Sequence, residues 1–179
     1  MYIRVLNFYK MKKYLLLIVF AFSTIASFSQ EKEEDVTTYY LIRHAEKNRT
    51  DTTNKDAHLT DKGTKRADHW ATVLSAANIN MVYTTAYNRT KETAQPTATK
   101  NGLKIHVYNP RKMYDDDFKH TTKGKNVLVV GHSNTTPAFV NKILGKKKYP
   151  QIADDNNNNL YIVTVTKRGA TSVLVKVVH

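Results

Sequence analysis

The stretch VLVVGHSN at residues 127–134 decides the fold, because its uninterrupted apolar run is typical of a β-strand that is covered on both faces. The run ends abruptly in a polar group that contains His132. A second run, TYYLI at residues 38–42, ends in the same way at Arg43 and His44. In open α/β sheets, ligands bind outside the carboxyl ends of such strands. The sequence therefore predicts a site at the edge where these two strands end.

The rest of the chain alternates between helical and strand patterns. Apolar side chains recur at helical spacing after Thr60, which is a suitable N-cap residue. Alternating segments near the carboxyl terminus predict a β-hairpin. Together these patterns predict an α/β fold, a three-layer α/β/α sandwich with a mostly parallel central sheet and a C-terminal antiparallel hairpin. The predicted helices span residues 60–77, 88–100 and 135–144, with an irregular or short helical piece at 110–122, and the further strands span 80–84, 103–108, 160–166 and 172–178.

The first 29 residues have the pattern of a secretory signal. Lys12 and Lys13 precede an uncharged apolar run at residues 15–22, and small residues follow, which predicts cleavage after Ser29. The functional start is then expected at Met11. The apolar run is short for a membrane span, which needs about 20 residues. Membrane contact is expected only if the segment stays uncleaved as an anchor, and a periplasmic or secreted location is predicted otherwise.

The expected domain organisation follows from this segment. Residues 30–36 are acidic and polar and predict a linker, and residues 37–179 predict one domain. The chain has 179 residues, 41% of them apolar, which is enough for a sizeable core. Its formal charge is +13, and removing the four basic residues of the signal segment leaves +9.

Composition excludes some chemistry. The chain has no cysteine, which excludes thiol catalysis and cysteine-ligated zinc. The histidines outside the two strand ends lack metal-ligand spacing, so no metal is predicted. The lysine run at residues 146–148 lacks interleaved aromatic residues, and no nucleic-acid partner is predicted. This run is more suited to steering anionic substrates toward the molecule.

Two arginines accompany the two histidines at the predicted edge of the sheet. Arg43 precedes His44 directly. Arg89 lies at the start of the predicted helix that follows the strand at residues 80–84. Planar guanidinium groups match phosphate oxygens with paired hydrogen bonds. The backbone amides at residues 133–135, including Ser133 and Asn134, open the next helix and add donors to an anion. The sequence therefore predicts a phosphate pocket.

The same residues carry a family resemblance. LIRHAE at residues 41–46 resembles the first signature of the histidine phosphatase superfamily, the phosphoglycerate mutase-like family. YTTAYNRTKETA at residues 83–94 resembles its second motif, and VGHSN at 130–134 resembles its third. The turn Leu59-Thr60-x-x-Gly63 resembles the entry to the family's first helix. The four motifs occur in the family's order, and the absence of a long insertion resembles the small phosphohistidine-phosphatase branch.

The resemblance implies a role for each matching residue. His44 would attack phosphorus and form a phosphohistidine, which water then hydrolyses. Arg43, Arg89 and His132 would bind the phosphoryl oxygens and stabilise the transition state. The implied activity is that of a histidine acid-type phosphatase, a phosphoric monoester hydrolase that acts on a small phosphorylated substrate without a cofactor.

The proton donor for the leaving group stays open at the level of sequence. The glutamate context that other branches place after the third strand is absent here. Glu46, Asp56 and Asp115 are candidates, and Asp116 and Asp117 are indistinguishable from Asp115. A solvated turn is the favoured interpretation of the three consecutive aspartates.

Three functions remain as hypotheses. The first is an exported, metal-independent phosphatase of phosphomonoesters. The second is a catalytically weak phosphate-binding or phospholigand-binding protein with the same pocket. A mutase is less favoured, because holding a phosphorylated product for return of the phosphate needs a lid that excludes water.

Overall fold

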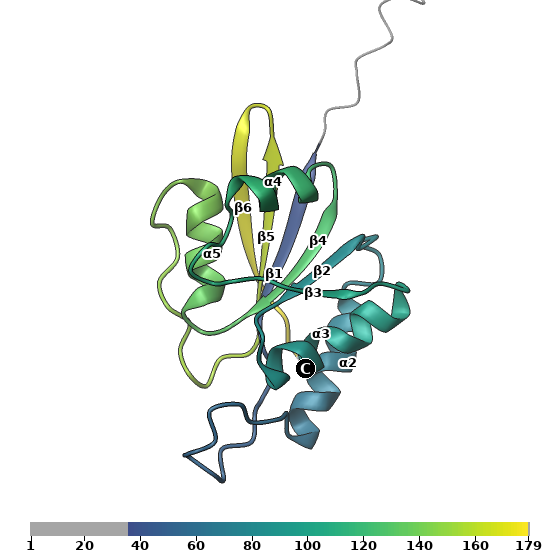
Figure 1. The fold of residues 1–179 in the computed structure, drawn as a ribbon, viewed down its shortest axis with the longest axis vertical. Coiled ribbons are helices and arrows are strands. Elements are labelled where there is room, and N and C mark those ends of the chain that lie inside the picture. The colour runs from purple at the N-terminus through teal and green to yellow at the C-terminus, as the bar shows by residue number, and fades with distance from the viewer. Residues whose placement is uncertain (1–35, 179) are drawn as a thin grey trace, which may run out of the picture. The chain divides into compact units, whose positions relative to one another are not determined.

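Strands β1 (Thr37–Arg43) and β4 (Asn126–Gly131) pair in parallel at the centre of a mixed six-stranded sheet in this computed structural model, which describes residues 36–178. The predicted signal segment and nearly all of the predicted linker lie outside the described residues. The strand order is β3-β2-β4-β1-β5-β6. Strands β2 (Met81–Thr84) and β3 (Ile105–Val107) continue the parallel part of the sheet beyond β4 (Figure 1).

The carboxyl-terminal hairpin supplies the antiparallel part of the sheet. Strand β5 (Asn159–Thr166) pairs with β1, and β6 (Gly169–Lys176) pairs with β5. The observed turn has two residues, Lys167 and Arg168, so β6 begins three residues earlier than the sequence pattern predicts. Gly169 adopts a positive φ of 126° directly after the turn, which a glycine accommodates readily.

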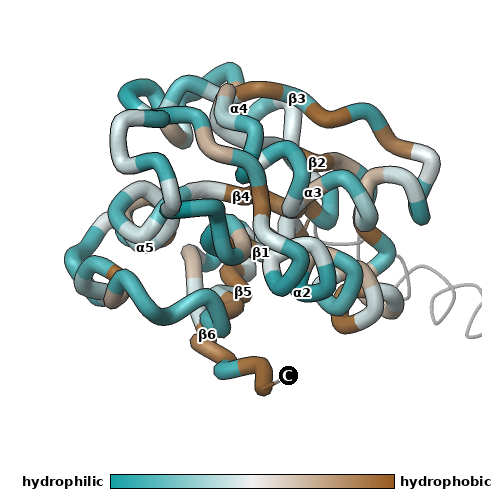
Figure 2. The backbone as a smooth tube through the Cα atoms, turned by 90° about the horizontal axis from the view of Figure 1, so that it is seen from below, coloured by the Kyte–Doolittle hydropathy of each residue, from teal (hydrophilic) through white to brown (hydrophobic). Residues whose placement is uncertain are grey.

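Helices cover both faces of the sheet (Figure 2). Helices α2 (Asp61–Val73) and α3 (Asn88–Lys100) pack over one face, where Trp70 belongs to the same core cluster as Ile42, Val82 and Leu128. Helices α4 (Asp116–Thr122) and α5 (Thr135–Leu144) pack over the other face, where Phe118 and Phe139 belong to the second core cluster. The predicted α/β sandwich is confirmed, and the ambiguous segment after β3 contains the short helix α4.

Two local details differ from the sequence prediction. The first predicted helix ends at Val73 instead of residue 77, and Leu74, directly after it, is buried in the core. Helix α3, by contrast, has its predicted bounds of 88–100, with Pro96 inside it. The edge strand β3 is shorter than predicted. No helix within residues 36–178 is long and apolar enough to cross a membrane.

The start of α2 is fixed on the loop that carries the first histidine. The Thr60 side chain caps the helix by accepting from the Gly63 N–H, as predicted, and the Thr60 N–H donates to the Glu46 carbonyl at 2.9 Å. Gly63 lies so close to this loop that an added Cβ would be 2.2 Å from the Glu46 carbonyl oxygen. The glycine therefore permits the helix to approach the site loop.

We expect Gly63→Ala to lower the free energy of unfolding by about 1–3 kcal/mol, because the added methyl group forces α2 away from the Glu46 backbone. Lys65→Ala in the same helix is the matched control, since Lys65 is exposed and its loss should change stability by less than about 0.5 kcal/mol. Urea unfolding of the three proteins measures the difference. Equal stability of the Gly63→Ala and Lys65→Ala variants would contradict the close packing described above.

Candidate phosphate site

The parallel pairing of β1 and β4 brings the two predicted histidines together. Their last residues, Arg43 and Gly131, lie opposite each other, and the His44 N–H donates to the Gly131 carbonyl at 2.9 Å. His132 follows Gly131 directly. The centroids of the two imidazole rings are 5.3 Å apart, with the ring planes inclined at 67°. Two histidines that are 88 positions apart in the sequence therefore lie side by side in the fold.

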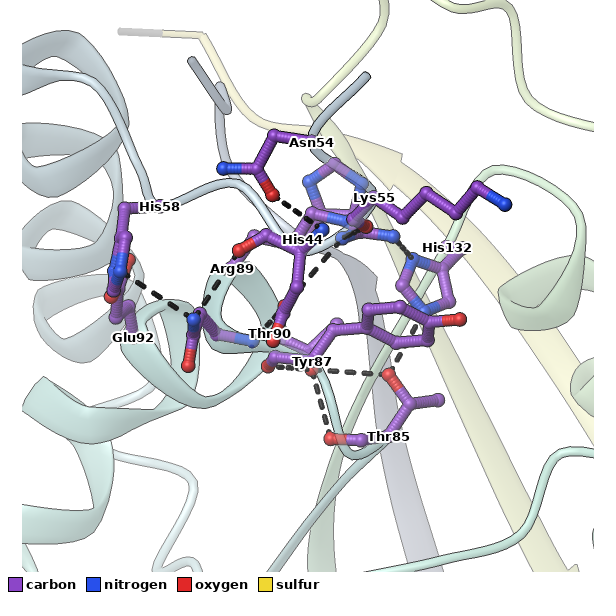
Figure 3. A network of polar contacts seen from close by, with 12 residues as sticks. His44, Asn54, Lys55, His58, Thr85, Tyr87, Arg89, Thr90, Glu92 and His132 are labelled. Atoms are coloured by element: carbon purple, nitrogen blue, oxygen red, sulfur yellow. Dashed lines mark hydrogen bonds and ion pairs between the residues drawn. The ribbon is translucent and has the colours of Figure 1, made fainter. Parts of the chain in front are cut away.

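Arg89 enters from the first turn of α3. Its Nη2 lies 3.5 Å from His132 Nδ1, and its Nη1 donates to the Lys55 carbonyl at 3.0 Å (Figure 3). The Tyr87 ring packs against both groups, 4.3 Å from the Arg89 guanidinium carbon and 5.1 Å from the His132 ring centroid. These contacts hold one guanidinium group beside the histidine pair.

Arg43 is anchored more firmly than the sequence suggests. Its Nη1 donates to three backbone carbonyls, those of Ala153, Asp154 and Asn156, at 2.8–3.1 Å. Its Nη2 donates to the Asp154 carboxylate at 2.8 Å. The buried Nε atoms of Arg43 and Arg89 have no hydrogen-bond partner among residues 36–178. The loop before β5 therefore fixes the Arg43 guanidinium group at the site.

These side chains line one pocket of about 390 Å³. The pocket contains every predicted phosphate-binding residue, together with residues from the loops around them. Its lining consists of Arg43, His44, Lys47, Arg49, Tyr87, Arg89, Pro110, His132, Ser133, Asn134, Thr135 and Asp154.

A match to known proteins covers the first two motifs. Residues 39–109 match the family model described as histidine phosphatase superfamily (branch 1). This segment includes Arg43, His44 and Arg89, whereas His132 lies beyond it. The resemblance inferred from the motifs is confirmed over this segment, which contains the first two of them. No curated protein sequence matches the chain.

Solved phosphatase structures share the fold at low sequence identity. The protein histidine phosphatase SixA, complexed with tungstate, is 15% identical with a TM-score of 0.64, over 78% of this chain and 96% of that one. A mutant phosphoserine phosphatase from Entamoeba histolytica, in complex with phosphoserine, is 15% identical with a TM-score of 0.60, over 76% and 95%. A mycobacterial glucosyl-3-phosphoglycerate phosphatase is 11% identical with a TM-score of 0.57, over 79% and 98%.

The first histidine phosphatase motif holds His44 in one tautomer. Its Nδ1 lies 2.7 Å from the Ala45 carbonyl oxygen. A carbonyl only accepts, so Nδ1 carries the hydrogen and donates it. The lone pair of the neutral ring is then on Nε2.

Hydrogen bonds also select the tautomer of His132. Arg89 can only donate, which makes His132 Nδ1 the acceptor in that contact. His132 Nε2 then donates to the Thr85 hydroxyl at 2.9 Å, and Thr85 contacts the Thr90 hydroxyl at 3.1 Å. Thr90 in turn donates to the Tyr87 carbonyl at 2.8 Å (Figure 3). Thr85 and Thr90 therefore orient His132.

Burial and like charge keep both imidazoles neutral. Burial lowers the pKa of His44 to about 3, with His132, Arg43 and Arg89 adding repulsion and the Ala45 hydrogen bond opposing the shift. Burial and the same two arginines lower the pKa of His132 to about 4. A neutral imidazole is the nucleophilic form, so His44 has an available lone pair near pH 7.

The three candidate proton donors differ in their surroundings. Both Glu46 oxygens accept from Arg66 at 2.8 Å, and although burial opposes the shift, these hydrogen bonds bring the pKa of Glu46 down to about 2. The Asp115 carboxylate caps α4 by accepting from the Phe118 N–H at 3.0 Å, and Asp115 does not line the pocket. Asp56 accepts from the Asn88 N–H at 2.7 Å and lies 4.0 Å from Arg89 Nη1, beside the pocket. The hydrogen bonds of Glu46 and Asp115 do not favour these two carboxylates as leaving-group acids.

Several pocket residues carried no clear signal in the sequence. Lys47 and Arg49 follow His44 at short spacing, but basic residues in a polar loop are usually solvated. Tyr87 lies inside the second motif, two residues before Arg89, and this position is the one signal in the sequence for its place in the pocket. Asp154 approaches from a loop 110 positions after His44, and nothing in its polar surroundings indicated the site.

We expect the free energy of unfolding to fall as the pH drops from 6.5 toward 4. The folded pKa values of both histidines lie below their usual value of 6.5, so the unfolded chain binds more protons in this window. The stability from these neutral rings is fully present above pH 6.5. Urea unfolding between pH 7 and pH 4.5 should show a shallower fall in the double variant His44→Gln/His132→Gln, and parallel curves would contradict the assignment.

Proposed function

We propose that the protein is a phosphatase that hydrolyses phosphomonoesters through a phosphohistidine at His44. One observation carries this proposal. The Nδ1–H of His44 donates to its own loop, which leaves the Nε2 lone pair free in a pocket that Arg43, Arg89 and His132 also line. A buried neutral nucleophile among fixed cations suits attack on a phosphoryl group.

The proposed reaction has two steps. His44 Nε2 forms a bond to phosphorus while the bond from phosphorus to the leaving-group oxygen breaks, and that oxygen takes up a proton from solvent water. A second water then attacks phosphorus and loses a proton to solvent, the P–N bond breaks with its electron pair returning to Nε2, and phosphate departs with His44 neutral again. Hydrolysis is favoured over a mutase reaction because the segment between β3 and β4 contains only the seven-residue helix α4 and no long covering insertion.

Fixed positive charge would stabilise the transition state. Arg89 is held by the Lys55 carbonyl and Arg43 by the loop before β5, so little reorganisation is needed when negative charge develops on the phosphoryl oxygens. A bound phosphate would also raise the pKa of His132 and allow its Nδ1 to donate to an oxygen. Ser133 and Asn134 line the same pocket at the start of α5 and complete the proposed phosphate site.

The metal-free and exported character of the enzyme is part of the proposal. Within the described part of the chain, no group of three or more histidine, aspartate or glutamate side chains is placed to hold a metal ion. The four cationic side chains that line the pocket, Arg43, Lys47, Arg49 and Arg89, would supply positive charge of the kind that a metal provides elsewhere. The signal pattern at residues 1–29 supports action in the periplasm or outside the cell.

We expect the protein to hydrolyse an aryl phosphate such as p-nitrophenyl phosphate in EDTA and to carry an acid-labile, base-stable phosphate label during turnover. His44→Ala should remove the label and lower kcat by at least about a thousandfold, because the nucleophile is lost. His106→Ala is the matched control, since His106 is exposed on β3 outside the pocket. Turnover that survives in the His44→Ala variant would overturn the covalent mechanism.

We expect Arg89→Ala to lower kcat/KM by about a hundredfold to a thousandfold, because a fixed donor to the transferring phosphoryl group is removed. Arg89→Lys keeps the charge but loses the planar fork and should recover only part of this loss. Steady-state kinetics with the aryl phosphate measure both variants. Near-normal kcat/KM in Arg89→Ala would remove Arg89 from the proposed machinery.

A specific observation supports a second candidate function, a weak phosphate-binding or phospholigand-binding protein. Asp154 is the one carboxylate among the described pocket-lining residues, and its hydrogen bonds to Arg49 and Arg43 keep its pKa below the usual range. A site without a leaving-group acid would bind phosphate and hydrolyse alkyl esters poorly. Aryl phosphates need no proton on the leaving group, so saturable binding without aryl phosphate hydrolysis would favour the second candidate.

A further inference from the structure

A second, smaller cavity adjoins the phosphate pocket. Its volume is about 160 Å³, and it shares five lining residues with the pocket. The cavity extends from the phosphate pocket toward the start of α2, where Lys62 lies. Its lining consists of Arg43, His44, Glu46, Lys47, Arg49, Lys62, Asp154, Asp155 and Asn157.

Two of the three carboxylates in this cavity are already matched by cations. Glu46 is paired with the Arg66 guanidinium group at 2.8 Å and lies 3.5 Å from Lys62 Nζ. The two oxygens of Asp154 contact Arg43 Nη2 at 2.8 Å and Arg49 Nη1 at 3.0 Å. Asp155 is exposed. Glu46 and Asp154 are therefore already matched by cations, and Asp155 makes no ion pair with a cation among the described residues.

Lys47 is a further cation in this cavity. It lines both the pocket and the smaller cavity, and its ammonium group has no carboxylate within 4.0 Å in the described residues. Burial lowers its pKa, and Arg89, Arg49 and Arg43 lower it further by repulsion, while Asp154 alone opposes them. The charge at this position is thus not matched by any ion pair among the described residues.

We propose that Lys47 binds a second acidic group of the substrate, so that the enzyme prefers phosphomonoesters that carry a carboxylate or a second phosphate near the ester. This inference rests on the proposed phosphatase function and names the substrate class for it. With the phosphoryl group beside His44, the second anion would lie at the junction with the smaller cavity. Arg49 and Lys62 suit this role less well because each already contacts a carboxylate.

Three ligands that share a three-carbon chain test the proposal. Propyl phosphate has no second acid, 3-phosphonooxypropanoate has a carboxylate, and propane-1,3-diol bisphosphate has a second phosphate. Calorimetric titration with the His44→Ala protein measures binding without turnover. We expect at least one diacidic ligand to bind about tenfold more tightly than propyl phosphate, as one charge-assisted hydrogen bond allows. The two diacids show which acidic group is recognised.

Adding Lys47→Met to the His44→Ala protein should bring the ratio of the affinities for the diacidic ligand and for propyl phosphate close to one. Lys62→Met is the matched control in the same cavity and should retain the preference for the diacidic ligand, which separates a contact with Lys47 from a general loss of positive charge. Equal affinities for all three ligands, a preference that survives Lys47→Met, or no binding of any of them would overturn the proposal. A failure of the phosphatase proposal appears separately, as absent aryl phosphate turnover in the unsubstituted protein.

Discussion

The parallel pairing of β1 with β4 is the constraint on which the site depends. The ladder continues one residue beyond the strands through the bond from the His44 N–H to the Gly131 carbonyl, so both histidines leave the sheet at the same level. Gly131 has no room for a side chain, since an added Cβ would lie 2.8–3.0 Å from Thr135, Thr136 and Tyr108. Helix α5 can therefore approach the end of the strand closely because residue 131 has no side chain.

Concentrating positive charge at this edge opposes folding, and the structure offsets that cost locally. Arg43 donates to three carbonyls and a carboxylate of one loop, and Arg89 donates to a carbonyl of another. Each arginine thereby exchanges water for fixed acceptors, as buried charge requires. The imidazoles meet the same requirement differently, by remaining neutral. The arginines remain charged and the imidazoles remain neutral. Before an anion binds, the pocket therefore carries positive charge beside the neutral His44 ring.

The sequence predicts the parts of the fold that depend on short-range patterns. The apolar runs of β1 and β4, the Thr60 cap and the alternating hairpin are all properties of neighbouring residues, and the α/β sandwich follows from their order. The position of His44 beside His132 is also predictable, because parallel strands end at one edge. The loop before β5 is different. Asp154 reaches Arg43 across 111 positions, and no local pattern among its asparagine and aspartate neighbours encodes that contact.

The same distinction explains why the proton donor was hard to predict. Glu46 stands two residues from His44, which makes it a natural candidate in the sequence, yet its carboxylate turns to Arg66 on α2. This ion pair connects the loop after β1 to helix α2, which Gly63 allows to lie close to the loop. Glu46 therefore stabilises the loop that carries His44. Carboxylates near the phosphoryl group would repel a phosphate dianion unless they were protonated or paired. Because Asp154 and Glu46 are both paired with arginine, neither is set up to give a proton to the leaving group of a bound phosphate ester. Substrates with good leaving groups suit such chemistry best.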